Sequence, residues 1–313
     1  MEGWPLTRTC AYLFPGQGSQ YVGMGRKLYD ASPAAHAVFE QSDAILGTFL
    51  SRLCFEGPAE QLNDTSNTQP AIFVVSVAAL RALEERGGDS AAYVAGHSMG
   101  EFSALAAAGA LSFEDGLRLV RERGRLMKEA GERGPGGMAA VIGLETESLE
   151  AICVEAREQS GEYVGVANDN CPGQVVISGA FGPLERAMEL ARERGARKVV
   201  RLAVSIAAHS PLMGEAAAEF RAILNATTFR ELVVPLVANA TAGPLTAPDD
   251  IRDALGRQLT SPVRWAESVR WMVGQGVGRF VEVGPGKVLT GLLRRIDRGV
   301  ERLTTAQAVA RGV

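Results

Sequence analysis

A serine between two glycines, GHSMG (96–100), separates two segments of different character. The preceding AAYVAG is typical of a buried strand, and the following EFSALAAAGALS (101–112) is typical of a helix of small residues that packs closely on a sheet. A strand, a Gly-x-Ser-x-Gly turn and a helix expose a serine side chain on a sharp bend. The same five residues also occur as a plain glycine turn, but the flanking segments favour Ser98 as a nucleophile.

Strand-like and helix-like segments alternate along most of the 313 residues, which predicts an α/β fold with a mostly parallel sheet. After the Gly/Pro-rich stretch 131–137 the order becomes β-α-β-β-α-β, which is typical of a ferredoxin-like unit. We therefore expect a large catalytic subdomain made of residues 1–130 plus 206–313, and an inserted ferredoxin-like small subdomain made of residues 131–205.

Composition excludes several classes of protein. The net charge of −4 gives no support for nucleic-acid binding, and no apolar run approaches the roughly 20 residues of a membrane-spanning helix. The N-terminus has no long apolar segment, so we expect no signal peptide. Four widely spaced cysteines and only three histidines predict reduced thiols in a cytoplasmic protein without a metal centre: Cys10, Cys54, Cys153, Cys171, His36, His97 and His209.

Two glycine-rich segments resemble nucleotide-binding motifs but fail the required spacing. In FPGQGSQYVGMG (14–25), Tyr21 stands where a dinucleotide-binding motif needs glycine. In VGPGKVLTG (283–291), a P-loop would need glycine in place of Val281. Both segments are predicted to be tight turns before helices, whose backbone N–H groups can hold an anion or a developing oxyanion.

A serine nucleophile needs a base, and the three histidines differ in suitability. His97 is adjacent to Ser98, so its side chain should diverge from that of the serine on a tight bend. His36 lies in a segment typical of a solvated surface helix. Elimination favours His209, which follows the last strand of the small subdomain, although an α/β-hydrolase would place its histidine later in the chain.

Arg123 lies in a helix that begins after Ser112 and has one apolar face. It is three residues from Val120 and four from Met127, both on that face, so it leans toward the core. A buried guanidinium needs a partner. One interpretation is an internal salt bridge to an Asp or Glu, and the other is a fork that binds a ligand carboxylate in a bidentate manner.

Several blocks together resemble the malonyl-CoA:acyl carrier protein transacylases and the acyltransferase domains of fatty acid and polyketide synthases. They span nearly the whole chain in the order of the family: FPGQGSQ (14–20), GHSMGEFSALAAAGALS (96–112), RERGRLM (121–127), NDNCPGQVVISG (168–179), AVSIAAHSPLM (203–213), QLTSPVRW (258–265) and EVGPGKVLTGL (282–292). The resemblance implies an α/β hydrolase-like body with a mostly parallel sheet and a ferredoxin-like insert.

The resemblance also implies roles for single residues. Ser98 corresponds to the acylated nucleophile and His209 to its general base, which a main-chain carbonyl at Gln258 orients in place of the usual aspartate. The backbone N–H groups of Gln17 and Met99 correspond to the oxyanion hole.

In the same way, Arg123 corresponds to the arginine that pairs with the free carboxylate of the malonyl group, and Met127 and Ala208 are expected to contact the substrate. Two departures concern the acyl pocket. Met99 replaces the common leucine, and Ala207 with Ala208 replaces a bulkier pair of some malonyl-specific domains. A roomier pocket would admit a branched extender, because one methyl group changes selectivity by only about 1–3 kcal/mol.

The activity implied is transfer of malonyl from malonyl-CoA to acyl carrier protein through a malonyl-serine ester. The CoA thioester and the carrier's phosphopantetheine are substrates, and no metal or other cofactor is expected. We expect a monomer that binds neither nucleic acid nor membrane. Because acyl carrier proteins are acidic, two basic clusters are candidate docking sites, with ordinary solvated charge as the alternative: Arg294, Arg295 and Arg298, or Arg194, Arg197 and Lys198.

Three alternatives keep the same fold. A discrete acyltransferase that serves a polyketide pathway would share this sequence pattern, although a free-standing chain favours fatty acid synthesis. A thioester hydrolase would share the serine and histidine, but such hydrolases tend to lose the arginine that this chain retains at Arg123. A non-catalytic scaffold is disfavoured because Ser98, His209 and Arg123 are all present.

Overall fold

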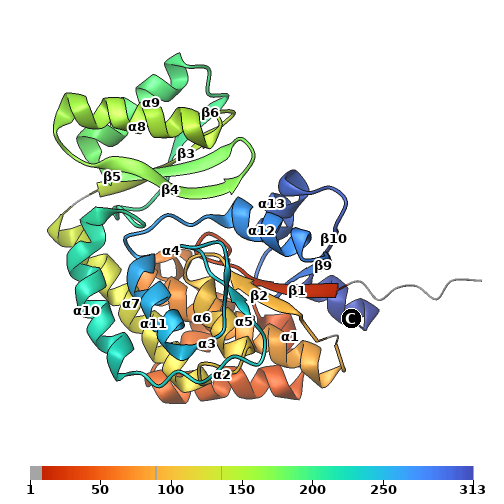
Figure 1. The fold of residues 1–313 in the computed structure, drawn as a ribbon. Coiled ribbons are helices and arrows are strands. Elements are labelled where there is room, and N and C mark those ends of the chain that lie inside the picture. Colours follow the sequence, from red (N-terminus) through yellow and green to blue (C-terminus); the bar gives the residue numbers. More distant parts are fainter. Residues whose placement is uncertain (1–8, 89, 135, 313) are drawn as a thin grey trace, which may run out of the picture.

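The computed structural model describes residues 9–88, 90–134 and 136–312, which form two sheets with helices packed on them (Figure 1). The larger sheet has six strands in the order β10-β9-β1-β2-β7-β8. Their bounds are β1 (Thr9–Phe14), β2 (Tyr93–Gly96), β7 (Leu236–Val237), β8 (Pro244–Leu245), β9 (Val277–Glu282) and β10 (Glu301–Thr304). All neighbouring pairs are parallel except β7 with β8, which confirms the predicted mostly parallel α/β sheet.

Helices cover both faces of this sheet because its strands are apolar on both sides. Along β1, Tyr12 and Phe14 join one core cluster, whereas Ala11 and Leu13 join another on the opposite face. The helices of this body are α1 (Arg26–Ala31), α2 (Pro33–Leu46), α3 (Leu50–Glu56), α4 (Ala59–Asn63), α5 (Thr65–Glu85), α6 (Gly100–Ala107), α7 (Phe113–Arg133), α10 (Gly214–Ala226), α11 (Pro248–Gln258), α12 (Trp265–Gly274), α13 (Val288–Ile296) and α14 (Thr305–Arg311).

Helix α5 packs along α7, and its central part, residues 71–83, is apolar nearly all round. This pattern is typical of a buried helix, and the side chains around the circumference of this part are buried. Phe73 of α5 stacks on Phe113 of α7 with ring centroids 5.7 Å apart. These two long helices are therefore a fixed support for residues that project from either of them.

The smaller sheet has the order β4-β5-β3-β6, with every neighbouring pair antiparallel. Its elements follow the predicted β-α-β-β-α-β order: β3 (Gly136–Ile142), α8 (Thr146–Ser160), β4 (Val164–Cys171), β5 (Gln174–Ala180), α9 (Phe181–Glu193) and β6 (Lys198–Arg201). A separate apolar cluster lies between this sheet and α8 and α9. The subdomain boundaries at 130/131 and 205/206 stay predictions.

Backbone hydrogen bonds join the smaller sheet to the larger body. The N–H of Asp169 donates to the Val263 carbonyl at 2.9 Å, and the Val263 N–H donates to the Ala167 carbonyl at 2.8 Å. The segment after α11 thus lies beside β4 as an additional short pairing, between the two parts of the molecule in Figure 1.

The described chain ends with β10 and α14, which follow α13. The segment ERLT (301–304) is too short and too polar to be recognised as a strand, and only its pairing with β9 makes it one. In the described residues, no helix combines the length and apolar character that crossing a bilayer requires.

Candidate active site

Ser98 lies on the bend between β2 and α6, with a backbone φ of 51°. The glycines on either side allow this bend because the backbones approach closely. A Cβ at Gly96 would lie 1.9 Å from the carbonyl carbon of Gly100, and a Cβ at Gly100 would lie 2.2 Å from the Phe14 oxygen. Both glycines are therefore required for α6 to begin directly against β1 and β2.

His209 reaches Ser98 from the segment after β6. Its Nε2 lies 2.8 Å from the Ser98 Oγ, and its Nδ1 lies 2.9 Å from the Gln258 carbonyl oxygen and 3.2 Å from that of Ser261. Because carbonyl oxygens only accept, Nδ1 carries the proton and Nε2 is free to accept from the serine hydroxyl. The Gln258 carbonyl thus lies where the sequence analysis expected it.

The charge state of His209 suits a base. Burial, followed by the positive charge of Arg123, lowers the pKa of His209 to about 3. The imidazole is therefore neutral around neutral pH, as proton removal from a hydroxyl requires.

Arg123 of α7 is buried, and its guanidinium points at the serine. Its Nη2 donates to the Ser98 Oγ at 3.2 Å and to the Gln258 Oε1 at 2.9 Å, and its Nη1 donates to the Gln69 Oε1 at 2.8 Å. Among the described residues, no carboxylate lies within ion-pair distance of Arg123, so the internal salt bridge considered above is wrong. Every side-chain acceptor that it contacts is neutral.

The protonation and remaining donors of Arg123 favour binding of an anion. Burial lowers its pKa to about 10, which leaves the side chain positively charged at neutral pH. Its Nε–H is buried and has no hydrogen-bond partner in the described part of the molecule. A buried cation with an unused donor and no directly bonded carboxylate is a site that a ligand carboxylate would satisfy.

Met127 and Gln69 surround the guanidinium. The Met127 Sδ lies 3.2 Å from the Arg123 Nη1 and 3.2 Å from the Gln69 Nε2. Gln69 is a residue that the sequence analysis missed, because an amide inside an apolar helix gives no signal of its neighbour. Ala208, which was expected to contact the substrate, is buried directly before His209 in the chain.

The backbone N–H groups of Gln17 and Met99 have no partner in the part of the chain that the structure describes. Gln17 follows β1, in a turn whose Gly16 lies so close to the His97 carbonyl that an added Cβ would be 2.3 Å from its oxygen. Met99 is the N-cap residue of α6. Within the described residues, neither the Gln17 nor the Met99 N–H donates a hydrogen bond, which leaves both available to an oxygen at the serine.

The other two histidines lie as the sequence analysis expected. The side chain of His97 diverges from Ser98, and its Nε2 lies 2.7 Å from the Oδ1 of Asn170 on β4. His36 is exposed on α2, where it stacks on Tyr29. Neither side chain reaches the serine hydroxyl.

Asn239 and Glu101 are two further buried residues close to Ser98, and the sequence analysis did not predict either of them. The Ser98 N–H donates to the Asn239 Oδ1 at 2.7 Å, and the Ser98 carbonyl accepts from the Gln258 Nε2 at 3.0 Å. The Glu101 carboxylate accepts from the Asn239 N–H at 2.6 Å and from the Gln258 Nε2. The only sign of Glu101 in the sequence is that it is the one carboxylate in the first turn of a helix of small residues.

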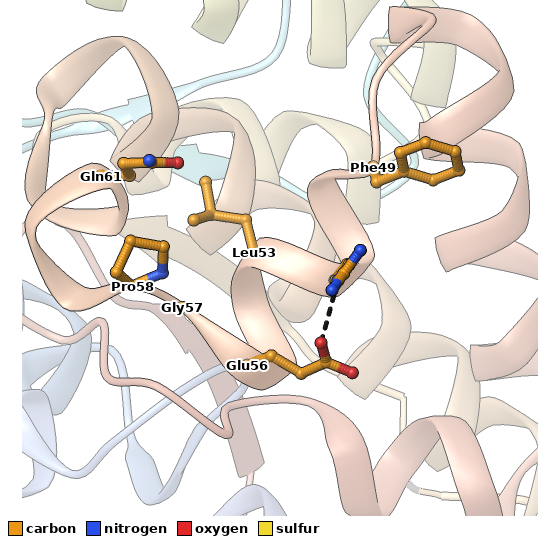
Figure 2. A pocket seen from close by; sticks show the side chains of 7 residues that line it. Phe49, Leu53, Glu56, Gly57, Pro58 and Gln61 are labelled. Atoms are coloured by element: carbon orange, nitrogen blue, oxygen red, sulfur yellow. Dashed lines mark hydrogen bonds and ion pairs between the residues drawn. The ribbon is translucent and has the colours of Figure 1, made fainter.

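Figure 2 shows a separate surface pocket formed by α3 and the turn into α4. Its polar lining includes an exposed pair, in which the Arg52 Nε donates to the Glu56 Oε2 at 2.9 Å. None of the lining residues belongs to the serine site: Phe49, Arg52, Leu53, Glu56, Gly57, Pro58 and Gln61. This pocket is therefore separate from the candidate active site at Ser98.

The arrangement around Ser98 combines three features that acyl transfer through a covalent ester uses: a hydroxyl, a neutral base in contact with it, and two N–H donors that have no partner among the described residues. A cation also lies beside the Ser98 oxygen.

Comparisons with known proteins agree with this arrangement. Residues 11–311 match the acyl transferase domain family. The malonyl CoA-acyl carrier protein transacylase of Bacillus subtilis is 45% identical over 296 residues, which cover 95% of this chain and 93% of that protein.

Two solved structures also superimpose closely on this chain. An acyl carrier protein S-malonyltransferase from Vibrio cholerae superimposes with a TM-score of 0.91 at 43% identity, covering 95% of this chain and 96% of that one. A malonyl-transacylase in complex with a type II polyketide acyl-carrier protein superimposes with a TM-score of 0.93 at 40% identity, covering 97% and 99%. The chain therefore belongs to the acyl transferase family.

Proposed function

We propose that this acyltransferase moves a malonyl group from malonyl-CoA to the pantetheine thiol of acyl carrier protein, through an ester on Ser98. The observation that carries the proposal is the position of the Ser98 Oγ, 2.8 Å from the His209 Nε2 and 3.2 Å from the Arg123 Nη2. The base and the cation thus meet at one oxygen. The curated and structural relatives described above carry the names of malonyl transferases, which supports the same choice of acyl group.

In the first half-reaction the His209 Nε2 takes the Ser98 proton while the oxygen attacks the thioester carbonyl. The negative charge that develops on the carbonyl oxygen is stabilised by the N–H groups of Gln17 and Met99, at about 3 kcal/mol for each donor. The C–S bond then breaks, and CoA leaves as a thiol with the proton that His209 held. The product is malonyl-Ser98.

In the second half-reaction the roles reverse. The pantetheine thiol of the carrier gives its proton to His209, and its sulfur attacks the ester carbonyl. The same two N–H groups hold the oxyanion, and Ser98 leaves with the proton from His209. The kinetics are ping-pong because CoA departs before the carrier protein reacts.

Arg123 selects acyl groups that carry a carboxylate. Its guanidinium binds the free malonyl carboxylate through the buried Nε–H and through the amino groups that donate to Gln69 and Gln258 in this structure. The bound carboxylate also offsets the positive charge that helps to lower the pKa of His209, so the substrate strengthens the base that acts on it.

The remaining features of the proposal concern the setting of the enzyme. We propose that the enzyme is a monomer. Every cysteine is free and buried, as we expect for a cytoplasmic enzyme. Of the basic candidates for carrier docking, Arg295 donates to the carbonyls of Pro172 and Gly173, and Arg194 pairs with Glu155, so structural contacts already engage these two.

Intact-mass measurement tests the proposal directly. The enzyme is incubated with malonyl-CoA, methylmalonyl-CoA or acetyl-CoA, and then with holo acyl carrier protein. We expect a malonyl adduct on the wild-type enzyme, loss of the adduct in Ser98→Ala, and transfer of the mass to the carrier. The control is Ser103→Ala, since that buried hydroxyl on α6 has no hydrogen-bond partner in the described structure. A preference for methylmalonyl, or release of malonate to water with no transfer, would contradict it.

A further inference from the structure

Glu101 is a buried carboxylate that the mechanism above does not use. It lies in the first turn of α6, three residues after Ser98, and its side chain is 2% exposed. Its two oxygens have different partners: Oε1 accepts from the backbone N–H of Asn239 at 2.6 Å, and Oε2 accepts from the side-chain amide of Gln258. Burying an ionised carboxylate costs free energy unless hydrogen-bond donors or an opposite charge stabilise it.

Both partners of Glu101 hold the backbone of the serine. Asn239 accepts from the Ser98 N–H and donates to the Gly96 carbonyl at 2.6 Å. Gln258 donates to the Ser98 carbonyl at 3.0 Å. The two peptide groups that flank the Ser98 Cα are therefore each bonded to a side chain, and both of those residues are fixed by the same carboxylate.

Gln258 also links Glu101 to the base and to the cation. Its Oε1 accepts from the Arg123 Nη2, and its main-chain carbonyl accepts from the His209 Nδ1. If its amide were reversed, its NH2 group would face the NH2 group of the guanidinium, and its oxygen would face the Ser98 carbonyl. The orientation of this one amide is therefore coupled to the carboxylate of Glu101.

The contacts favour the ionised form of Glu101. A backbone N–H can only donate, so the oxygen that faces Asn239 must accept. The oxygen that faces the Gln258 NH2 must also accept, unless that amide reverses. Protonation would turn one of these two oxygens into a hydroxyl, which is a weaker acceptor than a carboxylate oxygen, and would weaken that contact.

We propose that Glu101 is a positioning residue for acyl transfer: its ionised carboxylate holds Asn239 and Gln258 so that both peptide groups of the strained Ser98 stay fixed. The proposal rests on the proposed role of Ser98 as the nucleophile. It assigns Glu101 no contact with the substrate, so its effect on the rate is the same for malonyl and acetyl groups.

A pH dependence follows from the surroundings of Glu101. Burial raises its pKa to about 7, while the hydrogen bonds from Asn239 and Gln258 and the charge of Arg123 lower it. Burial keeps the pKa of His209 and of His97 below the ordinary value, so Arg123 is the charged group that faces the carboxylate. The other helices and strands packed on α6 carry further titratable side chains, which include Cys10, Tyr12, Tyr93, Arg81, Glu84, Glu85, Glu114 and Asp115.

None of these further side chains is among the causes of the Glu101 shift. As pH falls through about 7, Glu101 takes up a proton and the positioning contacts are weakened. The acylation rate of the wild-type enzyme should therefore fall below this pH. Acetyl-CoA separates this loss from titration of His209, because an acetyl group has no carboxylate to offset the Arg123 charge that helps to lower the pKa of His209.

The test is Glu101→Gln, with Glu282→Gln as the matched control. Glu282 is also a fully buried carboxylate, but it accepts from the N–H groups of Leu289 and Thr290 at the start of α13. Pre-steady-state acylation is measured from pH 5.5 to 8.5 with malonyl-CoA and with acetyl-CoA. We expect Glu101→Gln to lower the acylation rate about 10- to 100-fold for both thioesters and to be flat across neutral pH. Glu282→Gln should keep the wild-type pH dependence.

The outcomes separate this inference from the proposed function. If Ser98→Ala still forms an acyl-enzyme, the proposed function fails, whatever Glu101 does. If Ser98→Ala forms none but Glu101→Gln keeps the loss of rate below neutral pH, the inference on Glu101 is wrong. A reduction restricted to malonyl-CoA would also overturn it, because that would assign Glu101 to carboxylate binding.

A second measurement needs no variant, in case Glu101→Gln does not fold. The infrared band of a protonated carboxyl group is followed in wild-type enzyme as pH is lowered through neutrality. We expect the band to appear in parallel with the loss of acylation rate. A loss of rate without a carboxyl band in the same pH range would refute the role of Glu101.

Discussion

The Nε2 of His209 lies 2.8 Å from the Oγ of Ser98, although 111 residues separate the two in the chain. Both residues have a positive backbone φ, 51° for Ser98 and 59° for His209, and among the described non-glycine residues only Ala242 shares this feature. Such conformations cost about 1–3 kcal/mol each and persist only where neighbouring contacts hold them. The pair is therefore strained on both sides of the hydrogen bond that it forms.

Replacing Arg123 with Ala should separate malonyl from acetyl transfer. Loss of a charged hydrogen-bond donor should lower kcat/KM for malonyl-CoA about 10- to 100-fold more than kcat/KM for acetyl-CoA. Steady-state kinetics with both thioesters measure the two values. Arg118→Ala on the same helix is the control, because Arg118 is exposed and pairs with Glu114. Equal losses for both thioesters would exclude a role in carboxylate selection.

Replacing His209 with Ala should remove the base and change the stability of the protein with pH. We expect the acylation rate to fall about 100- to 10,000-fold. The pKa of His209 in the folded protein is about 3, below its ordinary value of 6.5, so the folded state disfavours the protonated form. The free energy of unfolding gained from neutral His209 is present above about pH 6.5 and is lost as pH falls toward 3.

Thermal denaturation between pH 4 and 7 measures this effect. The difference in Tm between wild type and His209→Ala should change with pH in the direction of wild-type loss at low pH. His36→Ala serves as the control because its side chain is exposed on α2. A pH-independent difference in Tm for His209→Ala would contradict the burial of a neutral imidazole.

Replacing Asn239 with Ala should reduce both stability and rate. It leaves the Ser98 N–H and the Gly96 carbonyl without their side-chain partner, which should cost about 2 kcal/mol or more of unfolding free energy. Acylation by malonyl-CoA and by acetyl-CoA should fall by similar factors. Asn225→Ala, at an exposed position of α10, is the control for urea denaturation and for kinetics. Unchanged acylation in a folded Asn239→Ala protein would show that Ser98 needs no support there.

Replacing Gly96 with Ala should prevent the nucleophile turn from forming. The added Cβ would lie 1.9 Å from the Gly100 carbonyl carbon, so β2 and α6 must separate, at a cost that we expect to exceed about 4 kcal/mol. Gly214→Ala is the control, because an added Cβ there meets no atom within 4 Å. Circular dichroism and Tm should show loss of the fold or strong destabilisation in the first variant only.

The sequence predicted those parts of the fold and of the site that depend on residues close together in the chain. The strand, turn and helix around Ser98 are local, and the predicted order of elements in the smaller sheet follows from alternating apolar patterns. Arg123 was noticed because a cation near an apolar helix face conflicts with the pattern of the helix. Its neutral partners were not predictable, because Gln69 and Gln258 come from helices distant in sequence.

Glu101 and Asn239 illustrate what the sequence could not provide. A glutamate in the first turn of a helix is common on surfaces, where it interacts favourably with the helix dipole. It is buried here because α6 packs against strands and other helices of the larger body, a tertiary arrangement that the local sequence does not reveal. Asn239 follows a strand of two residues, Leu236–Val237, so no periodic pattern marks its position.

The pairing of Val263 with β4 connects the smaller sheet to His209. Val263 is two residues beyond Ser261, whose carbonyl accepts from the His209 Nδ1. One short segment therefore bonds to the imidazole at one end and to the smaller sheet at the other, so the position of the ring depends on how that sheet lies against the larger body.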